Sequence, residues 1–185
     1  MSFHAYPSQI RAKADTALAL EQLYDYASSL SFPSDLIESR RSQLVESHQK
    51  LISDLKALEI PDSSDPEIMT SPLIVSTYRQ VIASQQLSSR VMNEAISNYP
   101  SVWNHLLPKA GEVMSSGASS LGWALGAAIG SQMAGEVYEE MKKDVTTVFV
   151  GDGSFVFGVP SASYWIARRY NTVSLSLLCF SSLSH

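Results

Sequence analysis

The spacing of hydrophobic positions changes along the chain, and over the first sixty residues it predicts helices. Between residues 7 and 30, apolar side chains recur at helical spacing, and Asp15 lies near the start of the run. A Phe32-Pro33 break follows, and Ser34 is a candidate cap for a second helix. That helix has a narrower apolar stripe, formed by Ile37, Leu44, Ile52 and Leu55. The pattern predicts a helical arm over residues 1–60, with charged flanks typical of a solvated packing surface.

Residues 61–72 are a predicted linker, and the pattern beyond them alternates between helix and strand. Prolines, aspartates and serines cluster in the linker. After it we expect helices over 73–87 and 119–142, a helical turn over 103–107, and short strands around Val91-Met92 and over 146–150. Such alternation is typical of an α/β domain with a parallel sheet. The predicted domain covers residues 73–172.

The strand predicted over residues 146–150 leads into the most informative stretch of the chain. It is continuously apolar or β-branched, as strands covered on both faces are. Gly151-Asp152-Gly153 follows as a predicted sharp turn, and a helix is expected from Ser154 to Tyr170. Ligands bind at the carboxyl ends of such strands, and helix N-termini attract anions. A carboxylate beside an anion site suits a phosphate bridged to magnesium, although Asp-Gly is also common in ordinary turns.

Three segments in this order resemble the cofactor-binding domain of thiamine diphosphate-dependent enzymes. They are the loop Asn93–Ser97, the glycine-rich run Ser115–Gly130, and Gly151-Asp152-Gly153-Ser154. The likeness is to the acetolactate synthase and benzoylformate decarboxylase group, and extends from about Met92 to Thr172. It implies an incomplete three-layer, parallel-sheet α/β domain preceded by the helical arm.

The resemblance also implies site residues. Asp152 would bind Mg²⁺, while Gly153 and Ser154 would offer donors to the diphosphate of the cofactor. Leu121 would wedge under the cofactor and hold its two rings in a V shape, unless it is an ordinary core residue. The carbonyl of Ser119 would accept a hydrogen bond from the aminopyrimidine. Ser97 would approach the diphosphate, with a helix-capping Ser-Asn pair as the alternative.

The implied activity is cleavage or formation of carbon–carbon bonds next to the carbonyl of a 2-oxo acid, as a lyase or transferase. The cofactor supplies that chemistry by accepting electrons. We assign no catalytic residue, because the family's catalytic glutamate lies in another domain, usually contributed across a homo-oligomer interface. The alternative is a non-catalytic, truncated cofactor-binding or scaffold protein.

The last thirteen residues, 173–185, form an atypical tail. The family motif closes with an Asn pair whose first member binds the metal, but here Phe180 and Ser181 occupy those positions. The tail could be a translated intron or a divergent strand, since residues 175–180 can alternate as a strand does. We expect the tail to leave the strand before Gly151 with an uncovered edge and the chain with little or no activity.

Composition and charge limit the classes of partner and the compartment that we expect. A net charge of −5 argues against nucleic acid, and the single cysteine, Cys179, fits a reducing intracellular compartment, either cytoplasm or mitochondrion. No signal peptide is visible, and the four histidines form no metal-binding spacing. Gly122, Gly126 and Gly130 have the spacing of membrane-helix interfaces, but the apolar run is short. We therefore expect no membrane partner and a helix that packs tightly against a sheet.

Overall fold

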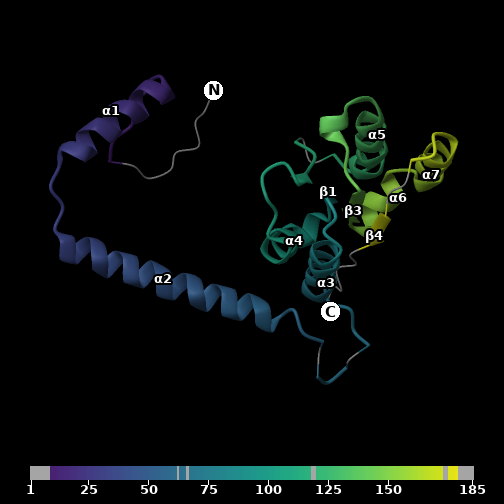
Figure 1. Ribbon diagram of the computed structural model, residues 1–185, viewed down its shortest axis with the longest axis horizontal. Helices are drawn as coiled ribbons and strands as arrows, with labels where there is room; N and C mark the ends of the chain where they lie inside the picture. Colours follow the sequence, from purple (N-terminus) through teal and green to yellow (C-terminus); the bar gives the residue numbers. More distant parts are fainter. Residues whose placement is uncertain (1–8, 62, 66, 118–119, 173–174, 179–185) are drawn as a thin grey trace. The chain divides into compact units, whose positions relative to one another are not determined.

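Four parallel strands form the sheet on which the candidate site is built (Figure 1). The computed structural model describes residues 9–61, 63–65, 67–117, 120–172 and 175–178. The strands are β1 (Ser89–Glu94), β2 (Val113–Met114), β3 (Val145–Val150) and β4 (Leu175–Leu178), in the order β2-β1-β3-β4. Every neighbouring pair runs parallel, so the strand-and-helix alternation correctly predicted the α/β class.

The helices of this unit fill the connections between the strands. They are α3 (Ser71–Ser84), α4 (Tyr99–Leu106), α5 (Trp123–Val137), α6 (Asp152–Phe157) and α7 (Pro160–Arg169), with 3₁₀ turns η1 (Ile96–Asn98) and η2 (Glu139–Met141). The single helix expected from Ser154 to Tyr170 is thus two helices, because Val159 has a φ of 47° and interrupts the helical path.

The core lies on both faces of β1 and β3, as the continuous apolar and β-branched run over residues 146–150 predicts. On one face, Val91 and Phe149 pack with side chains of α3 and α4, and Tyr78 meets the Phe149 ring edge-on at 5.5 Å between centroids. On the other face, Met92 and Val148 pack against the small residues of α5. Adjacent residues point to opposite faces of a strand, so one strand serves both clusters.

The chain divides into two compact units, residues 1–50 and 51–185. The first holds α1 (Thr16–Ser29) and most of α2 (Ser34–Ala57). Asp15 caps α1 by accepting a 3.0 Å hydrogen bond from the Leu18 amide, and neither helix contains a buried residue. The domain boundaries expected at residues 60 and 72 stay predictions. Among the described residues, no helix combines the length and apolar character needed to cross a bilayer.

The expectation of an uncovered edge on β3 is wrong for the described residues. Strand β4 pairs with β3 in parallel, in a register that joins Thr147 to Leu175 and Val150 to Leu178. The physical reason is that strand pairing uses backbone groups, which a divergent sequence still provides. Phe180 and Ser181, where the family has its Asn pair, lie outside the described residues.

A buried ion-pair network fastens the segment after α2 to α3 and α4. The carboxylate of Glu59 accepts hydrogen bonds from the Arg79 guanidinium, at 2.9 Å and 3.1 Å, and lies 3.0 Å from His105 Nδ1. A carboxylate only accepts, so that nitrogen carries the hydrogen. Arg79 also donates to the His105 carbonyl. Burial disfavours the charged form of Glu59, but the hydrogen bonds and charges of Arg79 and His105 prevail and lower its pKa from the usual 4.5.

We predict that Glu59→Gln lowers the free energy of unfolding by about 2 kcal/mol at pH 7, because Arg79 and His105 lose a charged acceptor. A carboxyl with a lowered pKa stabilises the fold above its unfolded pKa and loses that contribution as pH falls through its folded pKa. Urea unfolding should therefore show the difference at pH 7 and a smaller one near pH 3. A pH-independent difference would contradict the ion-pair assignment.

Candidate functional site

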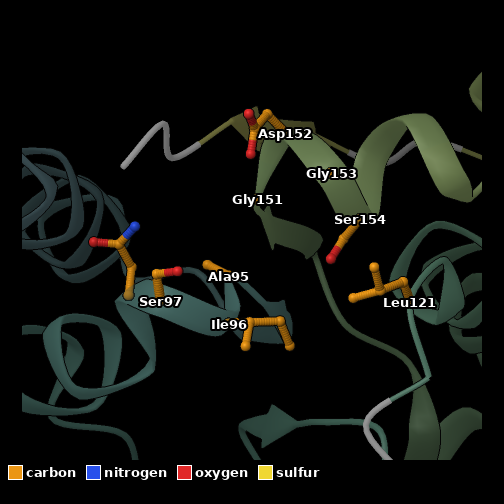
Figure 2. A pocket seen from close by; sticks show the side chains of 9 residues that line it. Ala95, Ile96, Ser97, Leu121, Gly151, Asp152, Gly153 and Ser154 are labelled. Atoms are coloured by element: carbon orange, nitrogen blue, oxygen red, sulfur yellow. The ribbon is translucent and has the colours of Figure 1, made fainter. Parts of the chain in front are cut away.

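A pocket of about 220 Å³ lies at the carboxyl ends of β1 and β3 (Figure 2). Nine residues from three segments line it: Ala95, Ile96, Ser97, Asn98, Leu121, Gly151, Asp152, Gly153 and Ser154. The parallel sheet brings the segments together, because its two central strands end side by side at Glu94 and Val150. Five predicted site residues, Ser97, Leu121, Asp152, Gly153 and Ser154, therefore line one pocket. The sixth, Ser119, lies outside the described residues.

Local hydrogen bonds shape the loop after β1. The Ala95 amide donates to Asn93 Oδ1 at 3.2 Å, and the Tyr99 hydroxyl donates to the Asn93 carbonyl at 3.1 Å. Burial, and then the negative charge of Glu94, raise the pKa of Tyr99, which keeps this hydroxyl protonated as a donor. Asn98 makes no capping bond to α4, since its Oδ1 accepts from the Ser71 hydroxyl instead. The loop thus presents Ser97 to the pocket without using it as a helix cap.

The loop after β3 enters α6 directly. Gly151 is extended, with φ −73° and ψ 157°, and neither Gly151 nor Gly153 has a positive φ. The predicted glycine-dependent sharp turn is therefore wrong. What Gly153 provides is space, because a Cβ built there would have no other atom within 4 Å. Asp152 is exposed beside it, and Ser154 is buried.

Leu121 forms the remaining wall and is not a core residue. Its side chain is 40% exposed, and Figure 2 shows the hydroxyl of Ser154 pointing toward it. The residue after it, Gly122, has a φ of 89°, and a Cβ there would lie 2.9 Å from the Cα of Gly158. This backbone contact sets the distance between the Leu121 wall and the end of α6.

The regularly spaced glycines of α5 do not all have the packing role that we expected. Cβ atoms added at Gly126 and Gly130 would meet nothing within 4 Å, so these glycines do not permit close packing. Close approach occurs at Gly122 and at Gly135, where a Cβ would lie 3.0 Å from the Cα of Lys142. The prediction that this stripe packs tightly is therefore wrong for two of its three glycines, although α5 itself packs against the sheet through Ala124 and Ala128.

The donor set of the pocket includes one carboxylate. Asp152 is the only acidic residue among the described lining residues. Within the described part of the chain, no three histidine, cysteine or acidic side chains gather as a metal-binding group. The pocket therefore fits a cation that takes most of its ligands from a bound phosphate and water, as Mg²⁺ does, rather than one held in an all-protein cage.

Sequence reasoning missed two residues that shape this site, Glu94 and Gly158. Glu94 belongs to the segment Asn93–Ser97 that suggested the family, but its residue type gave no hint of its contacts. Those contacts are with amides 29 and 30 residues further along the chain. Gly158 follows α6 and could be recognised only from the path of Gly122.

Comparison with known proteins shows what the domain is similar to. Residues 96–178 match the family of thiamine pyrophosphate enzymes, at their C-terminal TPP binding domain. This segment is similar to the C-terminal cofactor-binding domain of those enzymes. The match ends at Leu178 and so includes β4, which favours a divergent strand over an unrelated sequence for residues 175–178.

A solved structure supports the same fold. It is an X-ray structure of a protein isolated from Mycobacterium smegmatis and assigned as a thiamin diphosphate-dependent enzyme, at a TM-score of 0.50 and 20% identity. The match covers 60% of this chain and 20% of that one, so the chain spans about a fifth of that protein's length. No curated protein matches the chain.

We predict that Gly122→Ala destabilises the protein by about 1–3 kcal/mol, because a side chain is strained at positive φ and would collide with the backbone of Gly158. Gly126→Ala is the matched control, since that helical glycine has open space around it. Alanine there should stabilise α5 by about 0.5–1 kcal/mol. Chemical denaturation of both variants measures the difference, and equal effects would contradict the contact with Gly158.

Proposed function

We propose that this chain binds thiamine diphosphate together with Mg²⁺ in the pocket at the ends of β1 and β3, as part of an enzyme that acts on 2-oxo acids. One observation carries the proposal. Three segments that match or adjoin the thiamine pyrophosphate domain converge on one pocket, and that pocket combines a single exposed carboxylate with unfilled space at a glycine.

Asp152 is the proposed protein ligand of Mg²⁺. Magnesium is commonly held by one or two carboxylates while phosphate oxygens and water complete its octahedron. An exposed carboxylate in the pocket suits this role, since its oxygens can reach a cation that a ligand brings in. The diphosphate would then be the partner that retains the metal.

Gly153, Ser154 and Ser97 are the proposed diphosphate contacts. The space at Gly153 lets the backbone approach a ligand closely, and serine hydroxyls can donate to phosphate oxygens. The pocket volume of about 220 Å³ is below the 300–1,000 Å³ of a typical ligand site. This size fits the metal and diphosphate end of the cofactor, with its rings extending past Leu121.

Leu121 is the proposed apolar support for the cofactor rings. It stands between the pocket and α5 and offers 40% of its surface to whatever lies above it. When bound, the thiazolium ring supplies an electron sink next to the substrate carbonyl. The residues of this chain would hold that ring in position, since orientation is what a protein adds to cofactor chemistry. Acetolactate synthase-like and decarboxylase-like reactions are the candidate activities.

We predict that Asp152→Asn weakens Mg²⁺-dependent binding of thiamine diphosphate about tenfold or more, because the metal loses its charged ligand. Asp144→Asn is the matched control, since Asp144 precedes the same strand at the end away from the pocket. Titration calorimetry with and without Mg²⁺ measures the affinities. Equal affinity of Asp152→Asn and the parent chain would exclude the metal role.

A second prediction tests the space at Gly153. Gly153→Leu should abolish cofactor binding and leave the thermal midpoint nearly unchanged, because its side chain would occupy the pocket without meeting protein atoms near Cβ. Gly130→Leu, another exposed helical glycine with open surroundings, should bind like the parent chain. Binding by Gly153→Leu would place the diphosphate elsewhere. Binding without turnover of 2-oxo acids would favour a non-catalytic cofactor-binding protein.

A further inference from the structure

Glu94 is a fully buried carboxylate with an unusual set of partners. It lies at the end of β1 with 1% of its surface exposed. One oxygen accepts a 3.0 Å hydrogen bond from the Trp123 amide, and the other accepts a 2.9 Å bond from the Ala124 amide. Buried charges are costly unless paired, and here backbone amides at the positive end of a 15-residue helix do the pairing.

The start of α5 has no cap of its own. Its first amides lack partners within the helix, and the residue in the capping position, Gly122, has no side chain. The Glu94 carboxylate takes that role from a different element of the fold. Because each oxygen holds a separate amide, the bonds fix both the position and the rotation of the first helical turn relative to β1.

The same residue joins the three segments that line the pocket. It leads directly into the loop Ala95–Asn98, and its backbone carbonyl accepts a 3.3 Å hydrogen bond from the Gly151 amide. Its side chain holds the turn that carries Leu121, two residues before Trp123. No other described residue is bonded in this way to the starts of both the α5 wall and the α6 wall.

We propose that Glu94 is the positioning residue of the cofactor pocket, setting the Leu121 wall against the diphosphate-binding loops. The identity of the ligand in this inference rests on the proposed function. The positioning role itself rests on the hydrogen bonds of Glu94. The proposed role predicts different effects of a Glu94 substitution on binding of the cofactor rings and on binding of the diphosphate. Glu94→Gln removes the charge and at least one of the two side-chain bonds to α5, while the backbone bond to Gly151, and with it the diphosphate loop, remains. Ring binding should therefore suffer more than diphosphate binding.

The test compares Glu94→Gln with Glu59→Gln in the whole chain. Both remove a hydrogen-bonded carboxylate from the same compact unit, but Glu59 is only partly buried, binds Arg79 and His105 and does not line the pocket. The side-chain amide of glutamine has one acceptor oxygen, and its NH₂ group cannot accept a hydrogen bond. Glu94→Gln therefore cannot accept from the amides of both Trp123 and Ala124. Hydrogen exchange at these two amides should rise about tenfold in Glu94→Gln, as expected for loss of a charge-assisted bond. It should not change in Glu59→Gln.

Affinity provides the second measurement. With Mg²⁺ present, Glu94→Gln should bind thiamine diphosphate about tenfold more weakly and inorganic diphosphate with less than about threefold change. Glu59→Gln should change neither. If the parent chain binds no thiamine diphosphate, the proposed function fails, and the exchange measurement still decides the positioning role. Unchanged exchange in Glu94→Gln, or equal affinity losses in both variants, would overturn the inference. Should Glu94→Gln fail to fold by circular dichroism, Glu94→Asp, which keeps the charge but shortens the reach, carries the same measurements.

Discussion

The parallel, in-register pairing of β1 with β3 is the constraint on which the site depends. Ser89 pairs with Val145 and Glu94 with Val150, so the two strands begin and end together. Both loops therefore leave the sheet at one edge, where Ser97 and Asp152 face a shared space. A shift of the pairing by one residue would turn every buried side chain of β3 to the other face, and the two cores described above would be lost with the pocket.

The sequence predicted the parts of this arrangement that local pattern controls. The unbroken apolar run of β3 is diagnostic because both faces are buried, and Gly-Asp-Gly at its end lies in the wall of the pocket. The prediction for the two glycines of this motif was wrong, since Gly151 is extended and Gly153 contributes space rather than a turn. The positive φ values of Gly122 and Val159, which direct the chain into α5 and α7, depend on tertiary contacts that no local pattern records.

Glu94 and Glu59 show why residue type alone could not separate the site from its support. Both are acidic and lie next to apolar residues in the sequence. Glu59 is stabilised by the Arg79 guanidinium of α3 and the ring N–H of His105 in α4, whereas Glu94 is stabilised by backbone amides at the start of α5. The first arrangement ties the segment after α2 to the domain, and the second orders the pocket. Only the identity of the distant partner distinguishes them, and that information is tertiary.

Strand β4 and the proposed metal site make separate demands on the sequence. Pairing with β3 needs only backbone groups in an extended segment, and Leu175–Leu178 supplies these. A metal ligand needs one particular side chain at one position, so no backbone pairing can substitute for it. A departure from the family's Asn pair can therefore leave the pairing of β4 with β3 intact while it weakens the hold of the proposed site on a cation. In that case Asp152 and the bound diphosphate carry the coordination, and affinity for the cation is coupled to affinity for the cofactor.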